Sequence, residues 1–130
     1  MSRKISYKVP MYIKLGVKKI KNYSLNLNTY RNLHYQINNK LKQKFKEYLP
    51  NNLPKMNQIE IEYIIYPPNK RLLDLSNVGS VVDKYNCDAL IELGVIEDDN
   101  YTYVKRISYS FGSIDKDKKG YVLITIKEIK

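Results

Sequence analysis

Apolar and polar residues alternate along three stretches in the first half of the chain, and this period of two predicts half-buried β-strands. The first stretch covers residues 5–15, and the second is centred on Tyr23, Leu25 and Leu27. Residues 58–68 alternate at first and then become continuously apolar before a Pro-Pro pair. We therefore expect two N-terminal strands, the second partly an edge, and later a well-buried strand that ends at the prolines.

Two other segments place apolar residues at the three- and four-residue spacing of amphipathic helices. In residues 29–50 the apolar positions recur every fourth residue until Pro50 ends the pattern, and they are Leu33, Ile37, Leu41 and Phe45. Residues 76–93 form the second predicted helix, for which Gly94 is the expected C-terminal stop. Both helices are long enough to cover one face of a sheet.

The C-terminal third contains two more β-type stretches, at residues 101–111 and 120–129. The polar turn between them, residues 112–120, most simply predicts a β-hairpin. The predicted element order is β-β-α-β-α-β-β, without an internal repeat, a low-complexity tract or a linker. We therefore expect a single α+β domain over residues 1–130, in which a mixed β-sheet packs against two main helices.

Charge changes this picture, because 23 Lys and Arg face 13 Asp and Glu for a net charge of +10. A surplus of this size favours a polyanionic partner, either nucleic acid or an anionic membrane surface. A second interpretation stays open at this point. The many Lys, Asn, Ile and Tyr residues are also typical of a soluble protein from an AT-rich genome.

Cys87 is the only cysteine, so no disulfide can form within the chain, and a reducing compartment is expected. The N-terminus has no apolar region of signal-peptide length. No apolar run approaches the roughly 18 residues of a membrane span. The sequence therefore predicts a cytoplasmic protein that does not cross a membrane.

The acidic residues are concentrated, since seven of the 13 lie in residues 74–100. On a helical wheel at about 100° per residue, a polar stripe follows one edge of the second predicted helix. The apolar face beside this stripe contains Val78, Val82, Tyr85, Ala89 and Leu93, and the stripe itself consists of Asp74, Asn77, Val81, Lys84 and Asp88. Asp83 lies opposite the predicted core, with Ser76 and Ser80 towards the same side, and we interpret Asp83 as solvated surface.

An acidic turn, Glu97 to Asn100, follows this helix where the chain must double back into the next strand. Such a turn can bring Asp98 or Asp99 towards the polar stripe. Carboxylates from a helix and a loop suit Mg²⁺, which binds one or two of them and keeps water for a substrate phosphate. Metal-assisted phosphodiester cleavage is then the indicated chemistry, with Lys84 stabilising charge or positioning the phosphate. Helix capping and a solvated loop explain the same residues without a metal.

The segment DLSNVGSVVDKYNCDALIELGVIEDDN, residues 74–100, resembles the RusA family of Holliday junction resolvases, in the version common in phages and prophages of Gram-positive bacteria. LNLNTYRNLHYQINNKLKQKFK upstream and VKRISYSFGSIDKDKKGYVLITI downstream support the resemblance, which covers most of the chain. The family pattern is Asp-x-Asp-Asn, then Lys, then Asp-Ala-Leu, a Gly and a closing acidic pair. The matching positions are Asp74, Asn77, Lys84, Asp88 with Ala89 and Leu90, and Asp98 with Asp99.

The chain departs from this pattern in two places. Ser76 stands where the family has its second Asp, and a hydroxyl is a poorer Mg²⁺ ligand than a carboxylate. Asp88 is the candidate for supplying the missing charge. Four extra residues separate Asn77 from Lys84, about one helical turn, which keeps Lys84 on the same helix face.

The resemblance implies a Mg²⁺-dependent endodeoxyribonuclease, with Mn²⁺ as an alternative metal, that resolves four-way DNA junctions by paired nicks in recombination, repair or phage DNA processing. It also implies a homodimer, whose two sites match the two-fold symmetry of a junction, and a bacterial host cytoplasm. The expected metal ligands are Asp74, Asp88, Asp98 and Asp99. The expected catalytic residues are Asp74, Asn77, Lys84 and Asp99.

Several polar and basic residues are candidate DNA contacts through phosphate, which would carry no base sequence. Arg31, Asn32, His34 and Tyr35 lie near the start of the first helix, and His34 is expected to contact phosphate rather than metal. The other candidates are Arg71, the cluster Lys14, Lys18, Lys19 and Lys21, and the cluster Lys40, Lys42, Lys44 and Lys46. Solvated surface explains both clusters equally well.

Two further hypotheses remain. One is a catalytically inactive basic DNA-binding module of the same fold, such as a phage regulator, which Ser76 would favour. The weaker one is an RNA-binding domain.

Overall fold

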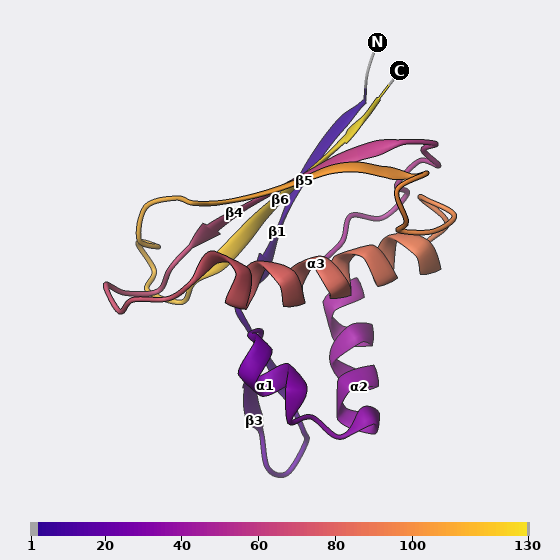
Figure 1. The fold of residues 1–130 in the computed structure, drawn as a ribbon. Coiled ribbons are helices and arrows are strands. Elements are labelled where there is room, and N and C mark those ends of the chain that lie inside the picture. Colours follow the sequence, from indigo (N-terminus) through magenta and orange to yellow (C-terminus); the bar gives the residue numbers. More distant parts are fainter. Residues whose placement is uncertain (1–2, 130) are drawn as a thin grey trace.

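Four strands form the central sheet of the computed structural model, which describes residues 3–129 (Figure 1). Their order across the sheet is β1-β6-β4-β5, with parallel pairing only between β4 and β5. The strand bounds are Lys4–Pro10 for β1, Ile59–Tyr66 for β4, Val104–Phe111 for β5 and Tyr121–Glu128 for β6. The predicted well-buried strand is β4, and it pairs on both edges.

The predicted hairpin between the last two strands is wrong, because β4 lies between β5 and β6. The connection passes around the end of β4, where Gly112 and Asp115 donate backbone hydrogen bonds to the carbonyls of Ile65 and Pro67, both at 2.8 Å. Asp115 then accepts from the backbone N–H groups of Asp117, Lys119 and Gly120 and fixes the turn into β6. The most apolar strand thereby gains two partners and the centre of the sheet.

The N-terminal strand prediction is divided at Met11. The chain leaves the sheet after β1 and forms a separate two-stranded hairpin from β2, Tyr12–Leu15, and β3, Lys21–Ser24. The backbone of Met11 accepts from the Leu25 N–H at 2.8 Å at the base of this hairpin. Two strands were expected in this region, and the structure adds a change of direction that the alternation pattern does not encode.

The helix predicted at residues 29–50 is two helices, α1 at Leu27–Arg31 and α2 at Tyr35–Lys46. The break lies between Asn32, the C-cap of α1, and His34, the N-cap of α2. His34 Nδ1 accepts from the Gln36 N–H at 3.2 Å, as N-cap side chains do. The apolar repeat begins at Leu33, just before α2, and its later members Ile37, Leu41 and Phe45 lie in α2.

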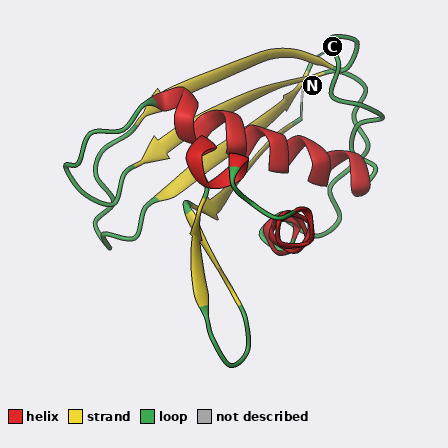
Figure 2. Cartoon of the chain, turned by 60° about the horizontal axis from the view of Figure 1, so that its bottom comes forward, coloured by secondary structure: helices red, strands yellow, loops and turns green. Residues whose placement is uncertain are grey.

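The remaining helix, α3, covers Leu75–Glu92, within one residue of the prediction at each end. It packs across one face of the sheet, and α1, α2 and the β2–β3 hairpin lie on its far side (Figures 1 and 2). The buried residues of α3 therefore extend well around the helix, and they are Val78, Gly79, Val81, Val82, Tyr85, Asn86, Cys87, Ala89 and Leu90. Leu93, expected in the core, is 44% exposed.

These elements make one small α+β domain with a mixed sheet and three helices. The main core lies between the sheet and α3 and continues to α2, whose Phe45 and Leu41 are buried. Within residues 3–129, no helix combines the length and apolar character needed to cross a membrane.

Candidate functional site

The predicted acidic residues lie along α3 and the loop that follows it, but they do not surround a single point. Asp74 is the N-cap of α3, without a side-chain capping hydrogen bond. Asp88 follows 14 positions later, which corresponds to about 21 Å along a helix. An aspartate side chain spans only a few ångströms, so Asp74 and Asp88 of one chain cannot bind the same metal ion.

Asp88 instead forms ion pairs with two lysines. Its Oδ2 lies 3.0 Å from Lys42 Nζ on α2, and its Oδ1 lies 3.4 Å from Lys84 Nζ one helical turn earlier. The Asp88 side chain is only 20% exposed. Its negative charge is therefore largely neutralised, and it links α2 to α3.

Asn77 also has a contact that positions an element. Its Oδ1 accepts a hydrogen bond at 3.2 Å from the backbone N–H of Leu27, the first residue of α1. In the next turns of α3, the Tyr85 ring meets the Tyr30 ring of α1 edge to face, with centroids 6.0 Å apart. Asn77 and Asp88 of the predicted stripe thus face α1 and α2 and hold these helices in place, while Asp74 and Lys84 are exposed.

The acidic loop approaches the middle of α3 through Asp99. Partial burial alone would lower the pKa of Lys84, but the charges of Asp88 and Asp99 raise this pKa overall. Asp98 has a local role, because its Oδ1 accepts from the Asp99 N–H at 2.7 Å and its Oδ2 accepts from Asn100 Nδ2 at 3.2 Å. Asp99, rather than Asp98, is the loop carboxylate whose charge affects Asp83 and Lys84 on α3.

Asp83 is half-buried, so its interpretation as solvated surface is wrong. Its Oδ1 accepts a hydrogen bond from the Tyr63 hydroxyl at 2.5 Å and one from the Cys87 thiol at 3.4 Å. Burial raises the pKa of Asp83, these two hydrogen bonds lower it in part, and the charge of Asp99 raises it further. The charge of Asp99 therefore influences the pKa values of both Asp83 and Lys84.

A chain of buried hydrogen bonds supports Asp83 from beneath. Tyr7 of β1 donates to Asn86 Oδ1 at 2.6 Å, and Asn86 Nδ2 donates to the Tyr63 hydroxyl oxygen at 3.1 Å. Tyr63 then donates to Asp83. Each hydroxyl or amide in this chain donates to the next group. The last acceptor, Asp83, has no cation within ion-pair distance among residues 3–129.

The wheel missed Asp83 because it assumed one buried face. Gly79, Asn86 and Cys87 extend the uncharged surface of α3 beyond the apolar arc, which is the signal in the sequence for contact on several sides. Gly79 lies directly against Tyr109 of β5, and its missing side chain makes room for the ring. Asp83 lies in the next helical turn after Gly79, under the same edge of the sheet.

The proposed DNA contacts at the α1–α2 junction all lie at the surface. The side chains of Arg31, Asn32, His34 and Tyr35 are exposed, and the His34 and Tyr35 rings stack at 4.6 Å. Arg71 is exposed in the loop before α3. The junction thus combines a cation with a stacked aromatic pair beside the helix that positions Lys84.

The two lysine clusters differ in their partners. On α2, Lys42 pairs with Asp88, Lys46 with Glu92 at 2.9 Å and Lys44 with Glu47 at 3.9 Å. On the β2–β3 hairpin, the lysines are exposed and have no carboxylate within ion-pair distance among residues 3–129, and they are Lys14, Lys18, Lys19 and Lys21. The hairpin therefore offers more unpaired positive charge to a ligand than α2 does.

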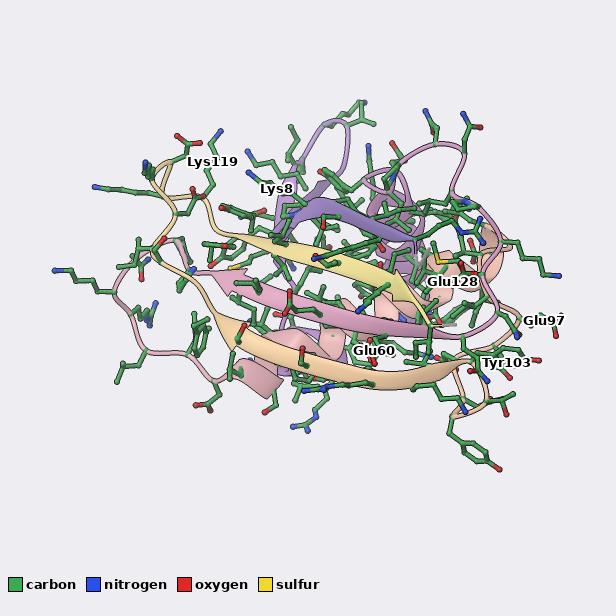
Figure 3. All side chains as sticks on the ribbon, turned by 90° about the horizontal axis from the view of Figure 1, so that it is seen from above. Lys8, Glu60, Glu97, Tyr103, Lys119 and Glu128 are labelled. Atoms are coloured by element: carbon green, nitrogen blue, oxygen red, sulfur yellow. The ribbon has the colours of Figure 1, made fainter. Side chains whose placement is uncertain are left out.

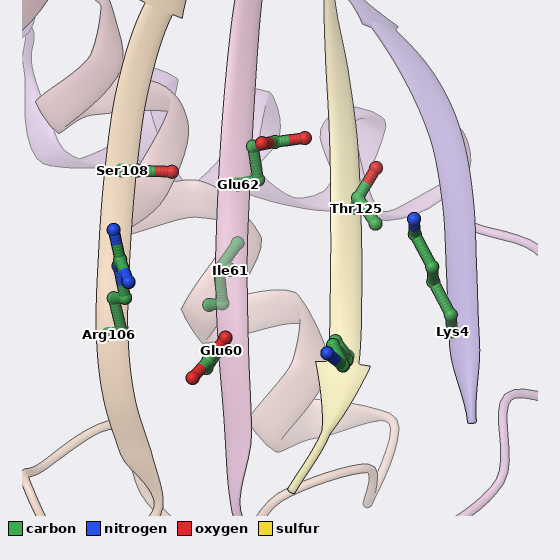
Figure 4. Close-up of a pocket in the computed structure, with 8 residues that line it drawn as sticks. Lys4, Glu60, Ile61, Glu62, Arg106, Ser108 and Thr125 are labelled. Atoms are coloured by element: carbon green, nitrogen blue, oxygen red, sulfur yellow. The ribbon is translucent and has the colours of Figure 1, made fainter. Parts of the chain in front are cut away.

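The face of the sheet away from α3 is a second polar surface. Figures 3 and 4 show its side chains, with Glu60 of β4 near Arg106 of β5 and Lys4 on β1 at the far edge. A shallow hollow of about 300 Å³ lies among these residues. The Tyr66 and Tyr121 rings stack at 4.5 Å at the other end of this face. Charges of both signs lie here, with Lys4, Arg106 and Lys127 beside Glu60 and Glu62.

No family model matches the chain, and no curated protein sequence matches it either. Among residues 3–129, no three His, Cys, Asp or Glu side chains are grouped so that they could hold a metal ion.

Proposed function

We propose that the protein is a structure-selective endodeoxyribonuclease that cleaves four-way DNA junctions by metal-assisted phosphodiester hydrolysis. The observation that carries this proposal is that Asp83 and Lys84, neighbours on α3, both interact electrostatically with Asp99 of the acidic loop, within a strongly basic chain. A carboxylate pair flanked by a cation suits the hydrolysis of a phosphodiester, because charge develops on phosphate oxygens in the transition state.

The distribution of charge along the chain supports a nucleic-acid substrate. Residues 1–46 contain 12 Lys and Arg and no Asp or Glu, which leaves 11 basic and 13 acidic residues in positions 47–130. The first third thus supplies the whole positive surplus. It forms β1, the hairpin, α1 and α2, and the last three of these lie on the side of α3 away from the sheet. DNA held by this region would meet α3 and its acidic residues.

The four carboxylates predicted to bind the metal cannot all do so within a single chain. The set Asp74, Asp88, Asp98 and Asp99 does not fit one ion, since Asp74 and Asp88 are too far apart and Asp88 is already paired with lysines. Asp99 and Asp83 do fit Mg²⁺ or Mn²⁺ by donor chemistry, because two carboxylates and water satisfy such ions. When bound, the metal would neutralise this pair and activate a water molecule for attack on phosphorus.

The residues of the chain would divide the remaining tasks. Lys84 would contact the phosphate, and Tyr63 would fix the orientation of Asp83. Asn77 would hold α1 and thereby set the position of Arg31 near the backbone of the DNA. A C₂ homodimer would present two such sites to the two-fold symmetric junction and allow paired nicks.

A labelled synthetic four-way junction tests the proposal directly. Incubation with Mg²⁺ is expected to give symmetric paired nicks, and incubation with EDTA is expected to give binding without cleavage. A linear duplex of the same sequence is the matched control and should stay intact. Cleavage of the duplex at an equal rate, or no cleavage of any branched DNA with Mg²⁺ or Mn²⁺, would contradict the assignment.

A DNA-binding module without catalysis is the second candidate. Two observations favour it: the double ion pairing of Asp88 and the presence of Ser76 where the resembling family has a carboxylate. This candidate predicts tight junction binding that Mg²⁺ leaves uncut.

A further inference from the structure

The β2–β3 hairpin extends away from the body of the protein and ends in a five-residue loop (Figure 2). Leu15 pairs with Lys21 at the last rung, and residues 16–20 form the tip. At the base, Ile13 of β2 is 2% exposed and anchors the hairpin in the core. The hairpin is thus a projecting arm with a fixed root.

The tip has a defined backbone shape. Gly16 has a φ of 114°, and a Cβ atom at this position would lie only 2.0 Å from the Lys19 carbonyl oxygen. Only glycine permits so tight an approach at this φ. The loop therefore closes on itself, and it presents its side chains outwards from a compact turn.

Two aliphatic side chains are exposed at this tip. Val17 is 97% exposed and Ile20 is 66% exposed, which are, with Leu72, the largest values among the large aliphatic residues of the described chain. Placing two branched aliphatic residues at the end of an arm leaves their apolar surface in water. The core does not need these side chains, because Ile13 and Leu25 already fill the base of the hairpin.

Four lysines surround the aliphatic pair: Lys14, Lys18, Lys19 and Lys21. All are exposed and none pairs with a carboxylate of residues 3–129. The nearest acidic residue in the sequence is Glu47, the C-cap of α2. The arm therefore keeps four uncompensated positive charges close to one apolar point.

We propose that this hairpin is a DNA wedge, in which the lysines hold phosphates and Val17 and Ile20 insert between bases at the branch point of a junction. The proposal rests on the proposed function in that it takes branched DNA as the partner. Apolar wedges flanked by basic residues are an established way to unstack base steps. A branch point suits such a wedge because its stacking is already interrupted and costs less to open.

The charge favours DNA over an anionic membrane as the partner. Arg31 of α1 and Lys40 of α2 are also exposed, and both helices lie on the same side of α3 as the hairpin (Figure 1), so a long rod-shaped polyanion has further cations on this side. The tip has no Trp, Tyr or Phe, the residues that anchor proteins at lipid interfaces. Binding to anionic vesicles is therefore an outcome that counts against the wedge.

The test uses the full chain, EDTA to prevent cleavage, and a four-way junction with 2-aminopurine beside the branch point. The wild type is expected to raise 2-aminopurine fluorescence as the base unstacks. The Val17→Ser/Ile20→Ser variant keeps every charge, and it should lose this signal and bind the junction about tenfold more weakly, with little change for linear duplex. Both positions are exposed, so folding should be unaffected.

The Lys18→Gln/Lys19→Gln variant tests the phosphate contacts. It should weaken junction and duplex binding alike and reduce the slope of log affinity against log salt by about two. Lys105→Gln/Lys116→Gln removes the same charge from exposed positions elsewhere and is the matched control, with a smaller effect expected.

The possible failures are distinguishable. If the wild type binds no DNA, both the wedge and the proposed function are wrong. If the wild type cleaves junctions but the serine variant binds and unstacks them normally, only the wedge is wrong. Binding of 30% phosphatidylserine vesicles through Val17 and Ile20, without DNA binding, would overturn the wedge in favour of a lipid surface.

Discussion

Tyr63 donates its hydroxyl proton to Asp83 at 2.5 Å, from the central strand of the sheet to the middle of α3. The same hydroxyl oxygen accepts from Asn86, which in turn accepts from Tyr7. A half-buried carboxylate is thus positioned by a hydrogen-bond chain that starts on the opposite edge strand. This arrangement ties the orientation of Asp83 to the core of the protein.

The raised pKa of Asp83 predicts a specific pH dependence of stability. Burial is the main cause of the increase, so the native state retains the proton above the usual pKa of 3.8, where the unfolded state has lost it. The free energy of unfolding should then fall as the pH rises from 3.8 through the native pKa. Asp83→Asn cannot titrate and should lack this decrease. Urea denaturation of both proteins at about pH 4 and about pH 7 measures the difference.

Asp115 serves as the comparison in that experiment. Burial alone would raise the pKa of Asp115. Hydrogen bonds from the backbone of Asp117, Gly120 and Lys119 outweigh this effect, so the pKa of Asp115 is lowered. Asp115→Asn should therefore act in the opposite sense, reducing stability at neutral pH and approaching the wild type in acid. Equal pH profiles for the two asparagine variants would contradict both assignments.

Tyr63→Phe should destabilise the protein without changing its fold. The substitution removes a fully buried hydroxyl and leaves one oxygen of Asp83 and the Asn86 amide short of a partner. Buried polar groups that lose a partner cost about 1–3 kcal/mol. Thermal and urea unfolding measure this loss. Tyr109→Phe, which removes the hydroxyl of a partly buried tyrosine on the neighbouring strand, is the control and should cost less.

Cleavage assays on single variants distinguish two possible catalytic centres, the Asp83–Asp99 pair and the family-implied set that contains Asp74 and Asp99. Asp99→Asn is expected to abolish Mg²⁺-dependent junction cleavage and to spare junction binding, because Asp99 belongs to both sets. Asp83→Asn should have the same effect if the centre is the Asp83–Asp99 pair. Asp74→Asn should then retain most activity. Loss of cleavage with Asp74→Asn and full activity with Asp83→Asn would instead favour the carboxylates that the family resemblance implies, Asp74 and Asp99.

Asp88 is expected to contribute to helix packing more than to chemistry. Its ion pairs with Lys42 and Lys84 are partly exposed, so solvent screens them and each is worth a few tenths to about 1 kcal/mol. Asp88→Asn should lower stability by about this amount and leave cleavage within a few-fold of the wild type. A double-mutant cycle with Lys42→Met isolates the interhelical pair. Complete loss of cleavage would make Asp88 a functional carboxylate.

The strand and helix patterns predicted most elements because burial repeats regularly along them. The limits of α3 were predicted within one residue, and β4 was correctly placed as the buried strand. The order of strands was not predictable in the same way, since β5 and β6 are adjacent in sequence but separated by β4 in space. Strand order depends on which strand gains most from two partners, and a local turn does not encode this.

The site was predicted less completely than the fold, for a related reason. A helical wheel distributes side chains around one helix, but it does not know how many neighbours surround that helix. Because α3 packs against the sheet and against α1 and α2, the stripe from Asn77 to Asp88 became interhelical. Asp83, assigned to solvent, faces Tyr63. The distance between Asp74 and Asp88 was implicit in the helix itself.

Gly79 provides a test of the close packing between α3 and β5. A Cβ atom at Gly79 would lie 2.6 Å from Cδ1 of the Tyr109 ring, well inside van der Waals contact. Gly→Ala in a helix interior normally stabilises by about 1 kcal/mol. Here the Tyr109 ring, whose centroid lies 5.5 Å from that of Tyr63, would have to move. Gly79→Ala should therefore destabilise the protein, by about 1–3 kcal/mol as overpacking does.

Two further variants identify the cause. Ser80→Ala changes the neighbouring, partly exposed position of the same helix and should stay within about 0.5 kcal/mol of the wild type. Tyr109→Ala in the Gly79→Ala background removes the clashing ring, so the double variant should be more stable than the sum of the two single effects predicts. Strict additivity would mean that the ring does not limit the approach of α3 to β5.

The pKa of Tyr109 gives a second measurement of the same contact. Burial, and then the charge of Asp83, raise the pKa of Tyr109 to about 12. Displacing the ring in Gly79→Ala should then lower this pKa towards 10, as the ultraviolet absorbance of an alkaline titration would detect.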